Sequence, residues 1–455
     1  MWVRTQDLYG VKEADERLVL DHDPDPSNIY AQLIAGQSFA SIPSLHLECG
    51  DCLEDCTIAY KTWGQLNNER DNVLVICHAL SGSADASDWW SPLIGPGRAF
   101  DPEHFFIFCG NVLGSPYGSA SPLAFRGKMG VRYGADFPPT TIRDDVRAHK
   151  LVLDALGVNS VAAVVGGSMG GMTALEWPLC TSPGYVKSLI PIATAADHSA
   201  WGISWAETQR QCIYADPTFR DGDYEPTPAT QPSTGLAAAR MVAMLTYRSC
   251  ASFDSRFGRR PPRPLRNTAG ADPLDLPRTD TTSLVTDKNP GHGRPAYIKS
   301  RKNPSFSAQG YLYYQGEKFV KRFDANCYLH LTNKMDSHDL TRGRADKSET
   351  QDEALRRLLS RVPSGALVIG VETDALFLPE QQNRLAACLP DASLSMLRSA
   401  DGHDGFLLEF EQLDELIQRK LRREYPGYYE TVLHSDQTCG SAPLSESLTG
   451  EVENW

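Results

Sequence analysis

Residues 166–170 have the types and spacing that would carry a serine nucleophile on a sharp turn. They read Gly-Gly-Ser-Met-Gly and fit the pattern G-x-S-x-G, with Ser168 at the centre. The apolar run 160–165 comes directly before them, and a helical stretch over 172–177 follows. This context is typical of a nucleophile elbow, whose flanking glycines let the strand and the helix approach each other closely. A phosphate-binding turn is the weaker interpretation, because the segment has neither the lysine of a P-loop nor the spacing G-x-G-x-x-G.

A serine becomes a good nucleophile when a histidine takes its proton and an acid fixes the tautomer of that histidine. On this topology the chain order is serine, acid, histidine, each at the carboxyl end of a strand. Asp374 follows a predicted strand over 366–371, and His403 lies in the loop after a predicted strand over 393–397. Ser168, Asp374 and His403 are therefore the predicted catalytic triad. Glu372 is the reserve acid, but it would need a different strand register.

The negative charge that develops on the substrate oxygen needs two backbone N–H donors, each worth roughly 3–4 kcal/mol. Met169, the residue after the serine, supplies one of them from the start of the predicted helix. The second is expected from the loop after an early strand, and residues 78–82 (HALSG) follow the predicted strand 72–77 directly. We therefore predict the N–H of Leu80 or Ser81 as the second donor. An ordinary strand-to-helix loop is the alternative interpretation.

Alternating strand and helix patterns position these residues. Before the elbow, strands are predicted over 57–62, 72–77, 105–110 and 160–165, the last of them apolar on both faces. A helix over 144–156 has a capping box formed by Thr141 and Asp144. After the strand 366–371, the alternation continues with helix 380–388, strand 393–397 and helix 406–423. The pattern predicts an α/β fold with a mostly parallel central sheet flanked by helices.

The chain divides into a core, an interruption and a core again. We predict an irregular N-terminal extension over 1–45 and an α/β core made of 46–200 and 350–425. The segment 201–349 is helical and aromatic, and it contains a Pro- and Arg-rich insertion over about 256–306 that we expect to be mobile. The tail, 430–455, is rich in Ser, Thr and Glu and is expected to be disordered.

The composition restricts the function classes. The 455 residues include 57 acidic and 44 basic side chains, and the net charge of -13 disfavours a nucleic-acid partner, which needs a basic face. No apolar run approaches the roughly 20 residues that cross a bilayer, and the first residues lack the apolar segment of a secretory signal. The 11 cysteines are expected to be reduced thiols. A cytoplasmic enzyme with no membrane partner is the prediction.

Four segments together resemble one known family. They are the elbow GGSMGGMTALEW, the early loop HALSGSADASDWW, the segment FIFCGNVLGSPYGSASP and the late loop GHDGFLLE. These segments are similar to the homoserine O-acetyltransferases of the α/β-hydrolase superfamily, above all to the fungal form. The resemblance covers about residues 45–425 apart from the insertion. It implies an α/β-hydrolase fold with a helical lid inserted before the last strands, and a homodimer formed through the middle segment.

The resemblance also implies a reaction. An acetyl group would move from acetyl-CoA, the acyl-donor substrate, to the hydroxyl of L-homoserine through an acetyl-serine intermediate, giving O-acetyl-L-homoserine for methionine biosynthesis. No metal and no bound cofactor are implied. Arg240 matches the arginine that pairs with the homoserine carboxylate, and Asp404 matches the carboxylate near its amino group. Tyr247 is similar to a tyrosine that lines the same pocket.

Alternatives stay open at this point. Arg240 could form a structural salt bridge, Asp404 could cap its loop, and Arg210 competes as a substrate ligand. A serine esterase or thioesterase would use the same triad and elbow, although Arg240 together with Asp404 favours an amino-acid acceptor. Other acceptors, L-serine or deacetylcephalosporin C, and succinyl-CoA as the donor are also compatible with the sequence.

Overall fold

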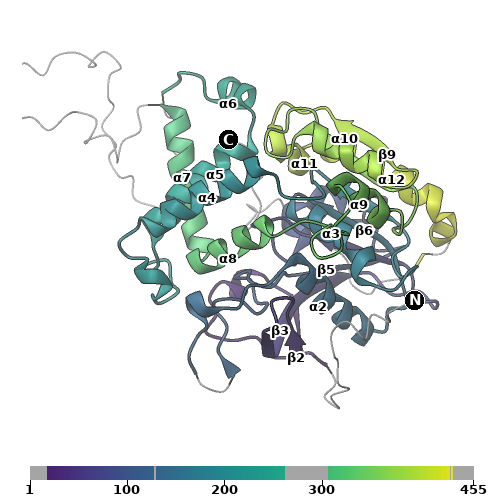
Figure 1. Cartoon of the computed structure of the whole chain (residues 1–455), viewed down its shortest axis with the longest axis horizontal. Helices are drawn as coiled ribbons and strands as arrows, with labels where there is room; N and C mark the ends of the chain where they lie inside the picture. Colours follow the sequence, from purple (N-terminus) through teal and green to yellow (C-terminus); the bar gives the residue numbers. More distant parts are fainter. Residues whose placement is uncertain (1–17, 128–129, 262–305, 431, 434–455) are drawn as a thin grey trace, which may run out of the picture.

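Nine strands form one sheet in the computed structural model, which describes residues 18–127, 130–261, 306–430 and 432–433 (Figure 1). The strands lie in the order β1-β2-β3-β5-β4-β6-β7-β8-β9. Their bounds are β1 Val19–Leu20, β2 Ser38–His46, β3 Cys52–Trp63, β4 Val73–Cys77, β5 Phe106–Gly110, β6 Val161–Gly167, β7 Leu189–Ile192, β8 Leu367–Val371 and β9 Ser393–Leu397. β1 to β3 pair antiparallel and β4 to β9 are mutually parallel, so the carboxyl ends of β4, β6, β8 and β9 meet at one edge.

Twelve α-helices accompany the sheet within the described residues. They are α1 Ala86–Trp89, α2 Ile142–Ala155, α3 Met169–Cys180, α4 Ala200–Tyr214, α5 Ser233–Tyr247, α6 Cys250–Arg256, α7 Ser307–Arg322, α8 Ala325–Asp336, α9 Gln351–Leu359, α10 Pro379–Cys388, α11 Gly405–Leu408 and α12 Phe410–Glu424. None of them combines the length and the apolar character that a bilayer-spanning helix needs.

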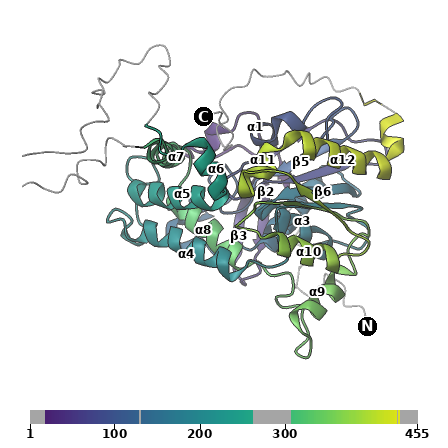
Figure 2. The same ribbon diagram turned by 90° about the horizontal axis from the view of Figure 1, so that it is seen from above.

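Helices cover both faces of the sheet, and β4 shows why. Its residues Val73, Val75 and Cys77 pack into an apolar cluster with α2, α3, α9 and α10. Leu74 and Ile76 point the other way and pack with α1 and α12. Figure 2 shows α12 on one side of the sheet and α3 and α10 on the other. A strand that is apolar on both faces is stable only between two such layers, and the predicted α/β architecture is confirmed.

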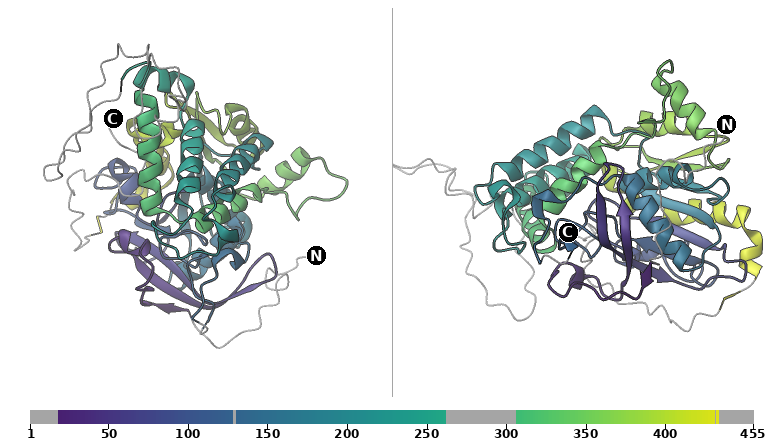
Figure 3. Two further views of the ribbon diagram at one scale, coloured as in Figure 1. Left: turned by 90° about the vertical axis from the view of Figure 1, so that its left-hand side faces the viewer. Right: turned by 60° about the horizontal axis from the view of Figure 1, so that its bottom comes forward.

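Helices α4 to α9 lie between β7 and β8 in the chain, and α4 to α8 form a group beside the sheet (Figures 1 and 3). We call α4 to α8 the inserted helices. Helix α5 packs against both α4 and α7. An apolar cluster joins the group to the core, with Leu80 and Met169 from the core and Leu236, Phe319 and Tyr328 from the inserted helices. The inserted helices therefore pack against the loops at the carboxyl edge of the sheet.

Most predicted elements before and after the inserted helices are present, and the capping box of Thr141 and Asp144 at the start of α2 is confirmed. The prediction of irregular structure through residue 45 is wrong for β2, which pairs with β3. Pro43 interrupts the strand signal there, but it is tolerated because β2 is paired on its far side only at Ala40 and Ser41. The predicted helix 406–423 is split at Glu409 into α11 and α12. The predictions for the insertion and the tail fall mostly outside the described residues.

Candidate active site

Ser168 lies on the turn between β6 and α3, in a backbone conformation that serine rarely adopts. Its φ is 57° and its ψ is -123°, a strained combination for a residue with a side chain. Hydrogen bonds hold this conformation: the Ser168 N–H donates to the Ile192 carbonyl at 2.9 Å, and the Thr194 hydroxyl donates to the Ser168 carbonyl at 2.8 Å. The turn therefore presents the serine beyond the carboxyl edge of the sheet.

The glycines around Ser168 are required by close packing. A Cβ at Gly170 would overlap the carbonyl oxygen of Cys77 at the end of β4, and a Cβ at Gly167 would overlap the ring of Phe406. A Cβ at Gly166 would overlap the backbone of Gly170 across the turn. The motif thus brings the serine turn against both the loop after β4 and the segment that follows His403.

His403 and Asp374 are paired in the structure. Nδ1 of His403 lies 2.7 Å from Oδ2 of Asp374, and both side chains are buried. Oδ1 of Asp374 accepts the N–H groups of Leu376 and Phe377, each at 2.9 Å. Because a carboxylate accepts hydrogen bonds, the proton of a neutral His403 stays on Nδ1, and Nε2 is the nitrogen that can accept a proton. Glu372, the reserve acid, is exposed, so the acid paired with His403 is Asp374.

Phe406 connects the histidine to the serine turn. The imidazole of His403 and the ring of Phe406 have centroids 5.2 Å apart, and Phe406 also packs against Gly167, the residue before Ser168. Phe406 therefore lies between the predicted base and the residue that precedes the predicted nucleophile, at the carboxyl edge of the sheet. The serine turn and the loop that carries His403 thus pack against one another through Phe406, although Ser168 and His403 are more than 200 positions apart in the chain.

The loop that carries the predicted donors Leu80 and Ser81 begins beside the elbow, because a Cβ at Gly170 would approach the carbonyl oxygens of Cys77 and His78. Met169 is the first residue of α3, and it belongs to the same apolar cluster as Leu80. His78 fixes the loop before Leu80: its Nε2 accepts the N–H of Val112 at 3.0 Å, so Nδ1 carries the proton that is shared with the Ala79 carbonyl at 2.8 Å. Burial lowers the pKa of His78 to about 4, which keeps this ring neutral at pH 7.

The predicted substrate residues Arg240 and Tyr247 both belong to α5. Arg240 is only 1% exposed, although it is a charged residue in an apolar stretch. Its Cζ lies 5.6 Å from the ring centroid of Tyr247, and that ring is 6.2 Å from the imidazole of His403. Helix α5 thus carries an arginine and a tyrosine to the side of the histidine. Arg210, the competing ligand, instead pairs with Glu207 and with Asp336 at 2.7 Å.

Arg248, which the sequence analysis missed, holds the loop that carries His403. Its Nη1 donates to Asp401 and its Nε lies beside Asp404, both at 2.7 Å. Gly402 has a φ of +70°, and a Cβ there would overlap the backbone where α5 gives way to α6. Asp401 and Asp404, which flank His403, could have indicated such an arginine from the sequence, because carboxylates that become buried need a counter-charge.

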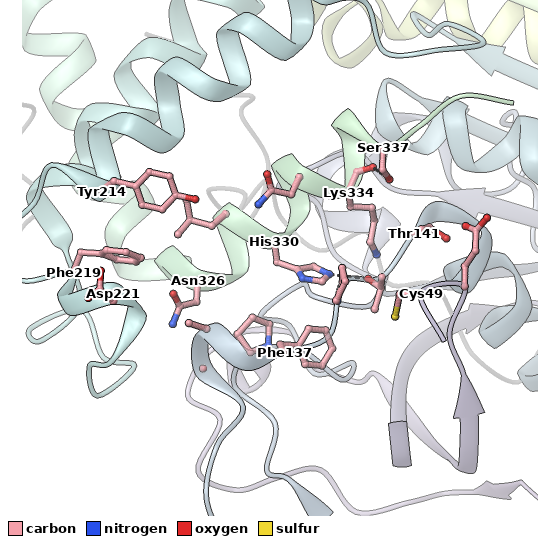
Figure 4. Close-up of a pocket in the computed structure, with 18 of the residues that line it drawn as sticks. Cys49, Phe137, Thr141, Tyr214, Phe219, Asp221, Asn326, His330, Lys334 and Ser337 are labelled. Carbon is pink, nitrogen blue, oxygen red and sulfur yellow. Dashed lines mark hydrogen bonds between the residues drawn. The ribbon is translucent and has the colours of Figure 1, made fainter. Parts of the chain in front are cut away.

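A cavity of about 640 Å³ lies elsewhere, between α8 and the loops before α2 (Figure 4). His330, Lys334, Phe137 and Tyr214 are among its lining residues, and none of the predicted catalytic residues lines it. His330 bonds to Thr140 at 2.7 Å, and the fully buried Lys334 pairs with Asp145 at 2.8 Å. These polar groups join α8 to the core, so we assign the cavity no catalytic role.

Residues 72–410 match the family described as alpha/beta hydrolase fold. Together with the parallel sheet, the serine turn after β6 and the acid and histidine after β8 and β9, this match defines the chain as an α/β hydrolase. The homoserine O-acetyltransferase of Schizosaccharomyces pombe is 46% identical to it, over 95% of this chain and 96% of that protein. The chain therefore belongs to the homoserine O-acetyltransferase family.

Two solved structures share the fold. The homoserine O-acetyltransferase from Bacillus anthracis has a TM-score of 0.68 at 21% identity, covering 88% of this chain and 98% of that one. Esterase E22 has a TM-score of 0.68 at 22% identity, covering 85% and 99%. Because the same fold carries a transferase and an esterase, the fold does not choose between water and an alcohol as the acyl acceptor.

Proposed function

We propose that this protein transfers an acetyl group from acetyl-CoA to the hydroxyl of L-homoserine, giving O-acetyl-L-homoserine and CoA. The observation that carries the proposal is the 46% identity to the Schizosaccharomyces pombe homoserine O-acetyltransferase over nearly the whole chain. The proposed place of the reaction is methionine biosynthesis in the cytoplasm.

In the first half-reaction Ser168 becomes acetylated. Its Oγ attacks the thioester carbon while Nε2 of His403 takes the hydroxyl proton, and Asp374 stabilises the resulting imidazolium. The N–H groups of Met169 and of Leu80 or Ser81 stabilise the oxyanion. The carbon–sulfur bond then breaks, the proton passes from His403 to the CoA sulfur, and an acetyl-serine remains. The support is the 2.7 Å contact between His403 and Asp374 beside the strained serine turn.

In the second half-reaction homoserine takes the acetyl group. Arg240 binds its carboxylate through two parallel N–H bonds, Asp404 binds its ammonium, and Tyr247 forms a wall of the pocket. His403 takes the proton of the homoserine hydroxyl, whose oxygen attacks the acetyl carbon, and Ser168 leaves with that proton. The Arg248 contact at 2.7 Å supports a fixed orientation of the Asp404 carboxylate.

The inserted helices act as the lid in this proposal. A transferase must keep water away from the acetyl-serine, and helices that pack on the catalytic loops would exclude it. The proposal includes a homodimer through the same helices. Three large apolar side chains on α4 and α5 support it by their exposure, namely Trp201 at 52%, Ile203 at 36% and Leu245 at 51%.

A serine esterase or thioesterase is the second candidate function. It is considered because esterase E22 has the same fold. Acetyl transfer to L-serine or deacetylcephalosporin C, and succinyl-CoA as the donor, remain variants of the first. A panel of acceptors and donors, followed by thiol release, separates these candidates. Homoserine is expected to give the highest kcat/KM with acetyl-CoA.

The route is tested with acetyl-CoA alone. We expect about one CoA per active site to be released rapidly, followed by slow hydrolysis, because the acetyl-serine waits for an acceptor. If CoA appears only after homoserine is added, the covalent route is wrong.

The acceptor site is tested with Arg240→Ala. We expect the homoserine-dependent kcat/KM to fall about 100-fold or more, because a charge-assisted bond to the carboxylate is lost. Hydrolysis of p-nitrophenyl acetate by the same variant is the control and should keep its rate. Equal loss of both activities would favour the hydrolase.

A further inference from the structure

The turn after β4 has a peptide that is held at both ends. The N–H of Gly82 donates to the Ala79 carbonyl at 3.0 Å, closing a turn with Leu80 and Ser81 in the middle. The Ser81 carbonyl, at the other end of the same peptide, accepts a hydrogen bond from Nη1 of Arg322 at 3.2 Å. Rotation of this peptide would break both bonds. The N–H groups of Leu80 and Ser81 belong to the two preceding peptides of the same closed turn, so their directions depend on the turn keeping this conformation.

Arg322 reaches this turn from the last residue of α7, 241 positions along the chain. The same Nη1 donates to the Tyr117 hydroxyl at 3.0 Å, and the side chain is buried. Both acceptors are uncharged oxygens. A buried guanidinium with such acceptors is costly in free energy, because nothing at these two contacts cancels its charge. Because this burial is costly, we expect the charge and the hydrogen-bond geometry of Arg322 to serve a function at this turn.

Arg322 also adds positive potential beside the predicted oxyanion site. Burial raises the pKa of Tyr117, and the charges of Arg322 and Arg240 oppose this rise. The Cζ atoms of Arg240 and Arg322 lie 4.6 and 4.9 Å from the ring centroid of Phe319. Two buried cations thus lie within one group of packed side chains. An anion that develops nearby is stabilised more strongly there than in water.

We propose that Arg322 is a positioning residue of the oxyanion site. It holds the Ser81 carbonyl and so keeps the closed turn of residues 79–82 in the conformation that directs the N–H groups of Leu80 and Ser81. Because Arg322 belongs to α7, the oxyanion site is complete only when α7 is docked on the core. The inserted helices then control acylation as well as covering the site. The inference rests on the proposed function only in that an oxyanion forms at an acyl group on Ser168.

The test compares Arg322→Met, Arg322→Lys and Gln231→Ala. Gln231 is the matched control, because its side chain supports the same end of α7 through the carbonyls of Val320 and Phe323 without a bond to Ser81. We expect Arg322→Met to lower the rate constant of acetyl-enzyme formation about 30-fold, with the KM for acetyl-CoA changed less than about three-fold. Arg322→Lys should recover part of the rate. Gln231→Ala should lower Tm and keep the rate constant.

A purely structural role of Arg322 predicts a different pattern. Arg322→Met would then lose Tm as Gln231→Ala does, keep the wild-type rate constant per titrated active site, and overturn the inference. If Arg322→Met does not fold, Tyr117→Phe tests the inference instead. This variant removes one hydrogen-bond acceptor of the guanidinium and should lower the rate constant of acetyl-enzyme formation about three-fold. A wild-type rate in Tyr117→Phe would then overturn the inference.

Hydrolysis of p-nitrophenyl acetate separates this inference from the proposed function. The ester also forms an oxyanion at Ser168, but it needs neither acetyl-CoA nor homoserine. A wild-type protein that hydrolyses the ester and ignores acetyl-CoA contradicts the proposed function. In that case the Arg322 variants still decide the inference, because their ester hydrolysis should fall in the same order.

Discussion

Two histidine–aspartate pairs contact the same phenylalanine, Phe377. In one, Nδ1 of His403 lies 2.7 Å from Asp374, and its ring is 5.2 Å from that of Phe377. In the other, Nδ1 of His198 lies 3.0 Å from Asp336, and its ring is 6.0 Å from the same phenylalanine. Taken alone, the geometry of the two pairs is nearly the same, yet we assign catalysis to only one.

The two carboxylates have different second partners. Oδ2 of Asp336 pairs with Arg210 at 2.7 Å, so this aspartate joins α8 to α4 through a salt bridge. The second oxygen of Asp374 accepts two backbone N–H groups of its own loop. Backbone donors fix the orientation of the Asp374 carboxylate without adding a second full charge beside the imidazole.

The second ring nitrogens also have different surroundings. Nε2 of His198 lies against Gly202 on α4, where a Cβ would not fit. His403 instead packs on Phe406, which also packs on Gly167 in the serine turn. We therefore expect a histidine–aspartate pair to act as a base only where the fold offers it a nucleophile, and we assign that role to the pair at the carboxyl ends of the parallel strands.

The largest expected effect comes from variants that break each of the two histidine–aspartate pairs separately. Asp374→Asn should lower kcat about 10⁴-fold, because an asparagine no longer selects the His403 tautomer or stabilises its imidazolium. Asp336→Asn is the matched control and should keep kcat within about three-fold per folded protein. The measurement is steady-state CoA release, with circular dichroism to check the fold. Similar losses in both variants would mean that the comparison is wrong.

A smaller effect compares the arginines beside the two pairs. Arg248 bonds to the acids that flank His403, and Arg210 bonds to Asp336; both are buried. Replacement of either by methionine should cost about 3 kcal/mol of unfolding free energy, because a buried carboxylate loses its partner. Only Arg248→Met should also lower kcat, by about 10-fold, because the loop that carries His403 loses the contacts that hold it in place.

Urea unfolding and kcat, measured on the same preparations, check this second prediction. Arg248→Lys should recover part of kcat, since it restores the charge but not the two-pronged contact. An unchanged kcat in Arg248→Met, despite the lost stability, would show that the His403 loop keeps its position without the Arg248 contacts.

The elbow and the order of the triad could be predicted from the sequence because local features determine them. Each glycine near Ser168 has a close neighbour that excludes a Cβ, and Asp374 and His403 lie in the loops that follow the strands β8 and β9. The pairing of His403 with Asp374 then follows from strand order alone. These features lie within a few residues of the groups they position.

The contacts of the inserted helices could not be predicted in this way. Arg248 forms a hydrogen bond with Asp401, 153 positions away in the sequence, and Arg322 forms one with Ser81, 241 positions away. Such contacts depend on how α5 and α7 pack on the core, which no spacing in the sequence records. β7 was also missed, because Leu189–Ile192 is only four residues long and contains a proline.

The smallest effect concerns histidines bonded to backbone groups rather than to a carboxylate. His78 and His149 are of this kind, and burial lowers the pKa of each to about 4. In the unfolded chain a histidine has a pKa of about 6.5. Between these values the unfolded state binds more protons, so the unfolding free energy falls as the pH drops from 6.5 towards 4. Urea unfolding at several pH values measures this slope.

His149→Gln isolates one contribution to the slope. A glutamine amide can replace the N–H that His149 donates to the Asn111 carbonyl, but it cannot take up a proton. The slope of the unfolding free energy against pH should therefore be smaller in the variant by up to about 1.4 kcal/mol per pH unit. Its unfolding free energy at pH 7 should change little. Burial raises the pKa of Asp145, so this carboxyl takes up a proton at a higher pH in the folded state than in the unfolded chain and opposes part of the wild-type slope. An undiminished slope in His149→Gln would mean that this ring is already protonated in the folded protein, and it would remove the distinction between backbone-bonded and carboxylate-paired histidines.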